Sequence, residues 1–247
     1  MAHEFPEIQT NEPLAQRVAT IRDSIDEAAD AAGRDPRGIT LMAVTKTRTP
    51  DEVRAAVAAG ITVLGENRVQ EARGKMPELD VSADWHMIGP LQTNKVNHAL
   101  ALFDMVQTVD RLKLARALND GIGRRVDREE DPEGRRLDVL VEVNTSGEDS
   151  KHGVPPDRAL ELLQQVSEFP RLRLRGLMTV GLLSSDESAV RAGFARLRKL
   201  RDEARDAVSG CTLDVLSMGM TSDYEWAIAE GSTIVRLGTA IFGPRAR

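Results

Sequence analysis

Lys46 is the residue whose type and setting could do covalent chemistry. It follows the apolar run 39–45, which has the length of a buried strand, and Thr49 to Glu52 then have the composition of a helix start. Parallel sheets bind ligands at the carboxyl ends of their strands, and a buried lysine there can lose its proton and attack a carbonyl carbon. The alternative is a solvated lysine at a strand exit, which position alone favours.

A turn rich in glycine and hydroxyl residues spans 216–225 and could hold a phosphate. Ser222 and Glu225 have the spacing of a capping box, so this turn is predicted to present backbone N–H groups at a positive helix end. Gly219 would let the backbone approach a ligand closely. An ordinary strand-to-helix turn is the alternative. Two residues add hydroxyl donors: Ser217 and Thr221.

A second turn of this kind, Gly238-Thr239, ends the apolar run 233–237. Barrel enzymes often hold a phosphate between the loops that follow their seventh and eighth strands. Taken alone, this turn is also compatible with an ordinary connection. Together with the turn at 216–225, and opposite Lys46, it predicts a phosphorylated carbonyl compound as the ligand.

Arg236 lies inside an otherwise apolar strand-like run. A guanidinium that faces the interior of a barrel needs an acceptor, because an unpaired buried charge is costly. The ring nitrogen of a pyridine could supply that acceptor. A structural ion pair with Glu66 or Asp223 is the alternative, and the sequence does not decide between the two.

Strand-like apolar runs must place these residues at one end of a sheet. Such runs alternate with capped or amphipathic segments along the chain, which is the pattern of strand–helix units. The runs are Ile39 to Thr45, Ile61 to Leu64, Trp85 to Ile88, Met105 to Val109, Leu137 to Val143, Leu172 to Thr179, Leu213 to Leu216 and Thr233 to Leu237.

The segments between the runs are long enough for helices of at least two turns. Eight strand–helix units in a chain of 247 residues predict an α/β fold, a (β/α)8 TIM barrel rather than an open sheet. A further helix, Leu14 to Ala32, is stopped by Gly33 and is expected to cover the outside or the bottom of the barrel. The predicted helical segments are 50–59, 69–77, 92–101, 111–125, 156–169, 186–208 and 222–230.

We expect a single domain over residues 1–247, with its core at 39–243 and a flexible segment at 1–11. The charge-dense segment 124–136 contains Pro132 and Gly134, which predicts a mobile loop.

The composition argues against several classes of protein. No stretch reaches the roughly 20 apolar residues that span a bilayer, and the amino end has no leader pattern, so we expect a cytoplasmic protein with no membrane partner. The net charge of −6 and the absence of a sustained basic face argue against nucleic acid as a partner. The single cysteine, Cys211, excludes an internal disulfide, and the four histidines lack metal-ligand spacing, so no metal site is predicted.

Several motifs resemble those of the pyridoxal-phosphate homeostasis protein family, and they occur in the family order along the chain. Met87 and Pro90 are slight departures within one motif, and the segment Asn144 to Gly153 is also close to the family form. The motifs are Val44 to Thr47, Gly65 to Glu71, Trp85 to Lys95, Ser217 to Thr221 and Arg236 to Gly243.

The resemblance implies a barrel similar to the amino-terminal domain of bacterial alanine racemase, with pyridoxal 5′-phosphate (PLP) bound to Lys46 as an internal aldimine. It implies that Arg236 faces the pyridine nitrogen. An arginine there would leave that nitrogen unprotonated, which discourages carbanion chemistry. Asn67 and His86 could line the ring, although a structural role is equally compatible with His86. The residues implied to hold the phosphate are Ser217, Met218, Gly219, Thr221, Gly238 and Thr239.

Further polar residues are predicted at the mouth of the barrel. They could contact a ligand or form hydrogen bonds within the loops, and the sequence does not decide between these roles. They are Glu66, Asn94, Lys95, Asn144 and Lys151.

Racemization by two bases needs a second acid–base group opposite the lysine. The chain is expected to encode no second domain that would supply one, and its only tyrosine, Tyr224, is predicted in the first turn of a helix. The resulting hypothesis is a monomeric, non-catalytic carrier that buffers PLP or delivers it to apo PLP-dependent enzymes.

Two other functions remain open from the sequence. One is a PLP-dependent amino-acid racemase or decarboxylase whose mouth loops supply the second base. The other is a lysine-dependent aldolase that acts on a sugar phosphate, because that chemistry uses the same strand-end amine and phosphate loops.

Overall fold

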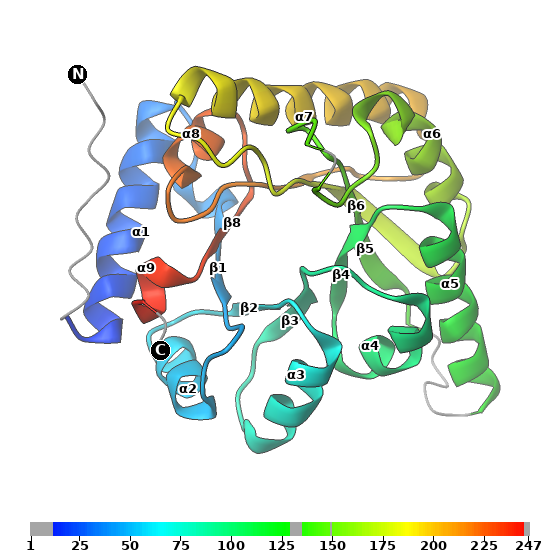
Figure 1. Cartoon of the computed structure of the whole chain (residues 1–247), viewed down its shortest axis with the longest axis horizontal. Helices are drawn as coiled ribbons and strands as arrows, with labels where there is room; N and C mark the ends of the chain where they lie inside the picture. Colours follow the sequence, from blue (N-terminus) through cyan, green and yellow to red (C-terminus); the bar gives the residue numbers. More distant parts are fainter. Residues whose placement is uncertain (1–11, 129–134, 149, 245–247) are drawn as a thin grey trace.

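The computed structural model describes residues 12–128, 135–148 and 150–244. Its parallel strands β1 to β8 pair in chain order, and β8 pairs with β1, which closes the barrel (Figure 1). The predicted (β/α)8 barrel is therefore confirmed. The segment 1–11, which was expected to be flexible, and the central part of the loop predicted at 124–136 lie outside the described residues.

Most strands lie within one residue of their predicted bounds, but β2 and β7 begin two residues late. The Ile61 N–H donates to the Ala56 carbonyl at 3.1 Å, so Ile61 belongs to the turn that ends the preceding helix. Leu213 has a left-handed φ of 46°, which a strand cannot contain. The strands are β1 Thr40–Val44, β2 Val63–Glu66, β3 Asp84–Met87, β4 Met105–Val109, β5 Leu137–Glu142, β6 Leu172–Met178, β7 Val215–Ser217 and β8 Ile234–Leu237.

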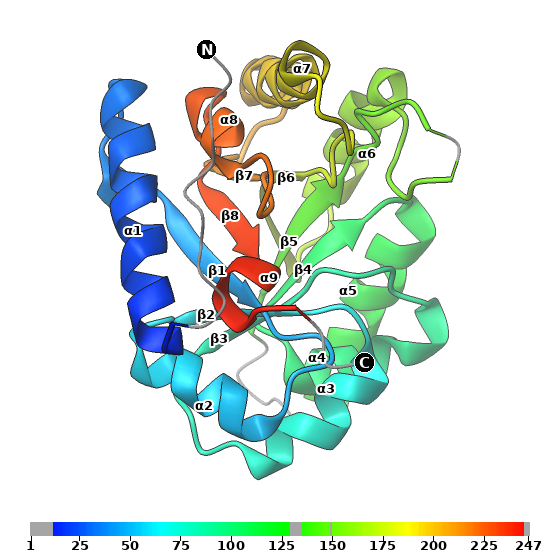
Figure 2. The same ribbon diagram turned by 60° about the vertical axis from the view of Figure 1, so that its left-hand side comes forward.

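Helices lie on the outside of the strands, as the alternating pattern predicts (Figures 1 and 2). Thr49 caps α2 through a capping box with Glu52. The helices are α1 Leu14–Ala31, α2 Pro50–Ala58, α3 Val69–Lys75, α4 Val96–Leu102, α5 Leu112–Asp127, α6 Pro156–Ser167, α7 Glu187–Ala207, α8 Tyr224–Ala229 and α9 Thr239–Phe242, with short 3-10 turns at η1 Pro36–Gly38, η2 Met76–Glu78 and η3 Thr93–Lys95.

Two local predictions are wrong. The capping box at Ser222 does not form, because α8 begins at Tyr224 after Asp223, and Glu225 accepts a hydrogen bond from Ser24 of α1 instead. The loop predicted from residue 124 begins later, because α5 continues to Asp127. The last buried residue of α5 is Gly123, so the final turn of this helix, from Arg124 to Asp127, is not held by burial in the core.

Alternate residues of each strand face the barrel interior and the helix layer. Inside the barrel, Met42 packs with Val63 and Ile234, and Met105 packs with Leu140 and Met178. The larger cluster lies between the strands and the helices and includes the apolar side of α7. Helix α1 packs against α2, α8 and α9 on the outside of the barrel (Figure 2). In the described part of the chain, no helix is both long and apolar enough to cross a membrane.

Candidate functional site

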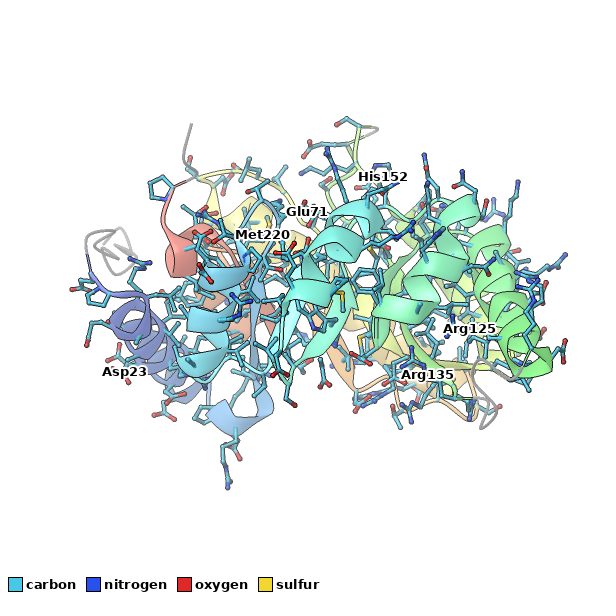
Figure 3. The ribbon with its side chains drawn as sticks, turned by 90° about the horizontal axis from the view of Figure 1, so that it is seen from below. Asp23, Glu71, Arg125, Arg135, His152 and Met220 are labelled. Atoms are coloured by element: carbon cyan, nitrogen blue, oxygen red, sulfur yellow. The ribbon has the colours of Figure 1, made fainter. Side chains whose placement is uncertain are left out.

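The loops that follow the strands gather on one side of the barrel. Figure 3 shows Glu71, His152 and Met220 on this side, whereas Arg125 and Arg135 lie on the opposite side. Lys46 belongs to the first of these loops, two residues after the end of β1, and is half-buried. Because Met42 faces the interior and side chains alternate along an extended segment, Lys46 is expected on the inner side as well.

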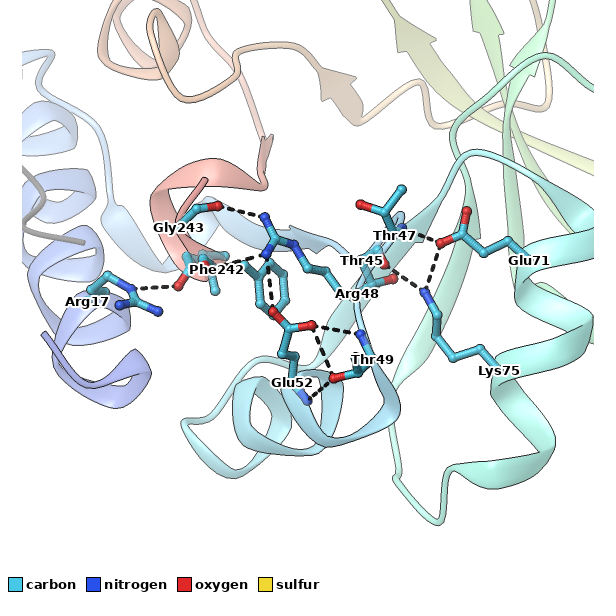
Figure 4. Close-up of polar contacts among 11 residues, drawn as sticks. Arg17, Thr45, Thr47, Arg48, Thr49, Glu52, Glu71, Lys75, Phe242 and Gly243 are labelled. Atoms are coloured by element: carbon cyan, nitrogen blue, oxygen red, sulfur yellow. Dashed lines mark hydrogen bonds and ion pairs between the residues drawn. The ribbon is translucent and has the colours of Figure 1, made fainter. Parts of the chain in front are cut away.

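The backbone around Lys46 is held from behind by charged residues of β2 and α3. The Lys75 ammonium donates to the Thr45 carbonyl and to Glu66 Oε1, both at 2.7 Å. The Thr47 N–H donates to Glu71 Oε1 (Figure 4). Both neighbours of Lys46 are thus tied to side chains that the helix layer supplies.

The two glycine turns predicted to bind phosphate lie side by side. Ser217 of β7 pairs with Ile234 of β8, and the Arg236 N–H donates to the Gly219 carbonyl at 3.0 Å. Within the described ranges, several backbone N–H groups of these turns donate to no protein acceptor, which leaves them available to an anion. They belong to Gly219, Thr221, Ser222, Gly238, Thr239 and Ala240.

Gly219 is required by the packing of its turn onto α8. Its φ is 95°, and a Cβ there would lie 2.6 Å from the Ala227 Cβ. Met218 is fully buried, and its N–H donates to the Ile234 carbonyl at 3.1 Å. Asp223 fixes the end of the turn, because its Oδ1 accepts from the Met220 N–H at 2.5 Å. The turn is therefore a rigid segment whose backbone atoms have fixed positions.

A chain of polar side chains crosses the barrel interior. Arg236 donates to the Ser217 hydroxyl at 2.8 Å and to the Thr179 carbonyl at 2.7 Å. The Ser217 hydroxyl donates to Gln107 Oε1 at 2.7 Å, and Gln107 Nε2 contacts His86 Nδ1 at 2.9 Å. Ser217 thus already has two partners inside the barrel, and its contact with a phosphate stays a prediction.

The direction of these hydrogen bonds sets the protonation of His86. Burial lowers the pKa of His86 to about 4, so its ring is neutral at pH 7. Because Gln107 uses its carbonyl oxygen for Ser217, its amide donates to His86 Nδ1. The ring proton is therefore on Nε2.

Arg236 is held by neutral acceptors. Burial lowers the pKa of Arg236 to about 10, while Asp223 and Glu142 oppose that shift by their charge. Arg236 therefore stays protonated at pH 7. Glu66, one of the ion-pair partners considered from the sequence, hydrogen-bonds to Lys75 and Thr45 instead.

The other predicted mouth residues lie in three places. Asn67 follows β2 and is half-buried, and its carbonyl lies so close to Gly89 that a Cβ there would be 2.2 Å from that oxygen. Asn144 and Lys151 make loop hydrogen bonds, the first to the Glu148 carbonyl at 2.9 Å and the second to the Gly181 carbonyl at 2.7 Å. Two residues lie in η3: Asn94 and Lys95.

Several residues of this region were not identified from the sequence. Gln107 is a buried polar residue within the apolar run 105–109, and the argument applied to Arg236 would have identified it. Lys75 and Glu71 gave no such signal, because an acid and a base four residues apart on a helix usually form a solvated pair. A groove of about 650 Å³ between α1, α7 and α8 contains none of the predicted site residues.

Comparisons with known proteins relate this chain to one described family. The family described as alanine racemase, N-terminal domain, matches residues 17–246. The chain is 46% identical over 234 residues to the pyridoxal phosphate homeostasis protein of Pseudomonas aeruginosa, with 94% of this chain and 96% of that protein covered. It is 41% identical over 241 residues to the protein of the same name from Escherichia coli, with 94% and 97% covered.

Among solved structures, PipY of Synechococcus elongatus with PLP bound is similar, with a TM-score of 0.79 and 33% identity over 93% of this chain and all of that one. A protein of Bifidobacterium adolescentis described as unknown has a TM-score of 0.84 and 38% identity, and the match covers 98% of this chain and 99% of that chain.

Proposed function

This chain belongs to the family of pyridoxal phosphate homeostasis proteins, and on that premise we propose that it binds PLP at Lys46 and buffers or delivers it without acting on amino acids. PLP supplies an aldehyde that condenses reversibly with a primary amine and releases water. We propose that Lys46 supplies the amine and that the turns at 217–221 and 238–240 bind the phosphate. The same relatives support it, since their names and the PipY structure refer to PLP.

The observation that carries the proposal is the set of backbone donors in the two turns. Six N–H groups on adjacent strand ends have no protein acceptor among the described residues, and Gly219 allows the first turn to pack tightly on α8. Such donors match the three acceptor oxygens of a phosphate ester. With a primary amine at the end of β1, this donor set fits a phosphorylated aldehyde. The amide donors of Ser222 and Ala240 extend the set of phosphate residues predicted from sequence.

Arg236 and Asn67 complete the proposed site. Arg236 is protonated at pH 7 and has its terminal nitrogens fixed by Ser217 and Thr179, so it can donate a hydrogen bond but cannot give up its proton. We propose that it faces the pyridine nitrogen and that Asn67 lies beside the ring.

Tyr224 supports a role without catalysis. Its hydroxyl contacts the Ser24 hydroxyl of α1 at 2.7 Å, which directs it to the outside of the barrel. Burial raises the pKa of Tyr224 to about 12, so it would be a poor acid–base group at pH 7. The single tyrosine of the chain therefore does not face Lys46 as a second base would have to.

Mass spectrometry of the protein after incubation with PLP and borohydride tests the binding proposal. We expect one pyridoxyl group, located at Lys46 by peptide mapping, and none in Lys46→Ala. Lys199, whose side chain is 80% exposed, is an internal control for non-specific labelling. A modified lysine elsewhere, with Lys46 unmodified, would refute the site.

Delivery is tested by mixing the PLP-loaded protein with an apo PLP-dependent enzyme. The carrier role predicts faster activation of that enzyme than with the same concentration of PLP alone. Equal or slower activation would argue against delivery and leave only buffering.

One observation favours the racemase or decarboxylase alternative. Glu142 ends β5 and is buried, and burial raises its pKa to about 7, which suits an acid–base group at neutral pH. Exchange of an amino acid's α-hydrogen with solvent, abolished by Lys46→Ala and by Glu142→Gln, would establish this alternative. Our proposal predicts no such exchange.

A further inference from the structure

Lys75 is a buried lysine that the proposed binding chemistry does not use. It is 7% exposed, and its ammonium lies 2.7 Å from Oε1 of Glu66, which is fully buried. Removing two charges from water is costly, and apolar side chains of similar volume are often equally stabilising. Simple stability therefore does not explain why an ion pair occupies this position between β2 and α3.

The contacts of this ion pair converge on the two residues that flank Lys46. Thr45 is tied twice, because its carbonyl accepts from Lys75 at 2.7 Å and its hydroxyl donates to Glu66 Oε1 at 2.6 Å. Thr47 is tied once, through its N–H to Glu71. Lys75 also contacts Glu71 Oε1 at 3.2 Å, which joins the two ties into one network (Figure 4).

The network holds Thr47 in an unfavourable backbone conformation. Its φ is 63°, a left-handed conformation that a β-branched residue adopts only when its surroundings impose it. The Thr47 N–H donates to Glu71, and the Arg48 N–H donates to the Thr45 carbonyl at 3.0 Å, so a side-chain contact and a backbone hydrogen bond both hold this turn. Because Thr45 faces α3, the alternation of side chains turns Lys46 toward the barrel interior.

We propose that Lys75 and Glu71 are positioning residues for Lys46. They hold the peptide groups on both sides of it, so that its amine is presented to the barrel interior before any ligand arrives. This inference rests on the proposed function, because it assigns these residues to the amine that captures PLP. It predicts that loosening either tie slows capture while the barrel remains folded.

Glu71 offers a conservative pair of variants. Glu71→Gln keeps an oxygen that can accept from the Thr47 N–H, whereas Glu71→Leu removes it. We expect Glu71→Leu to slow PLP capture at Lys46 on the order of tenfold. Glu71→Gln should restore most of that rate. The rate is measured by quenching with borohydride at timed intervals and by mass spectrometry of the Lys46 peptide.

A second readout does not involve PLP. Hydrogen exchange of the Thr47 amide in the apo protein should be faster in Glu71→Leu than in wild type and in Glu71→Gln. A role confined to overall stability would change exchange throughout the barrel rather than at this amide.

Lys75→Met alone would leave Glu66 buried without its ion-pair partner and could unfold the protein. The double variant Glu66→Leu/Lys75→Met removes both charges and avoids that problem. It should also slow capture at Lys46. Arg175→Met is the matched control, because Arg175 pairs with Asp138 and Asp214 without contacting the Lys46 turn. Its capture rate should equal that of wild type.

The outcomes separate this inference from the proposed function. If wild type captures no PLP at Lys46, the proposed function fails. If wild type captures PLP, and Glu71→Leu and the double variant do so at the same rate with unchanged Thr47 exchange, only the positioning role is refuted.

Discussion

Arg236 carries its charge inside the barrel with Ser217 and the Thr179 carbonyl as its hydrogen-bond partners. The electrostatic compensation comes from Asp223 and Glu142, neither of which hydrogen-bonds to it among the described contacts. This arrangement keeps the guanidinium in place without neutralising it by a direct ion pair. If Arg236 donates a hydrogen bond to a neutral ring nitrogen, as proposed, its guanidinium must both keep its position and keep its charge.

Glu142 should make the free energy of unfolding depend on pH near neutrality, where few carboxylates titrate. Its pKa is raised from 4.5 to about 7 by burial, so the folded state binds more protons than the unfolded state between these values. Stability from this group is therefore complete below pH 4.5 and is lost as the pH rises through 7. We expect a loss of up to about 3 kcal/mol across this range.

Urea unfolding of wild type and of Glu142→Gln between pH 4.5 and 8 measures this effect. The difference between the two proteins removes the contribution of every other titrating group. The free energy of unfolding of wild type should fall relative to that of the variant as the pH rises. Parallel pH profiles would show that Glu142 titrates normally.

At the scale of elements, the site depends on strand-to-helix turns whose backbones are held by different means. The turn after β1 is held by side chains of α3, and the turn after β7 is held by packing on α8. The turn after β8 continues into α9, whose end is tied to α1 and to the β1–α2 loop. Arg17 donates to the Ile241 carbonyl at 2.8 Å, and Arg48 donates to the Gly243 carbonyl at 2.6 Å (Figure 4).

The two turns that are proposed to bind phosphate should respond differently to alanine. Gly219→Ala is expected to cost about 1–3 kcal/mol, because φ is 95° and the new Cβ would lie 2.6 Å from the Ala227 Cβ. Gly238→Ala is the matched control, since its φ is −117° and its Cβ would meet Val44 at 3.6 Å. It should change stability by less than about 0.5 kcal/mol. Equal losses in urea unfolding would contradict this explanation of Gly219.

On the scale of the whole molecule, the barrel brings together groups that lie far apart in sequence. The hydrogen-bonded side chains that run from His86 to Arg236 join β3, β4, β7 and β8 and reach the end of β6. A ligand held by Lys46 after β1 and by the turns after β7 and β8 would connect strands on both sides of the closure between β8 and β1.

Ligand binding at this closure should stabilise the entire barrel. At a concentration one hundred times its dissociation constant, PLP is expected to add about 2.7 kcal/mol to the free energy of unfolding. This corresponds to a rise in Tm on the order of 5–10 °C. Lys46→Ala should keep part of the rise, because the backbone donors of both turns remain.

Differential scanning calorimetry with PLP and with pyridoxal at equal concentration provides the control. Pyridoxal has the aldehyde but lacks the phosphate, so its effect should be clearly smaller. An equal rise with both compounds would show that the two turns do not bind the phosphate.

The sequence by itself determined the barrel, because apolar runs of strand length alternated with amphipathic segments in one repeating order. It also placed Lys46, Gly219 and Gly238 near strand ends, since Lys46 and Gly238 directly follow such runs and Gly219 comes shortly after one. These are local properties, because the hydrophobic periodicity and the turn-forming residues of a short segment are enough to predict them.

Only the tertiary structure decided which side chains meet. It paired Lys75 with Glu66 next to the Lys46 turn, and it directed Tyr224 toward α1. It also placed the Ser217 hydroxyl in hydrogen bonds with Arg236 and Gln107. These contacts join residues whose separation in sequence carries no information about their distance in space. Their identity depends on the register and closure of the sheet, which fix side-chain directions only once all eight strands are assembled.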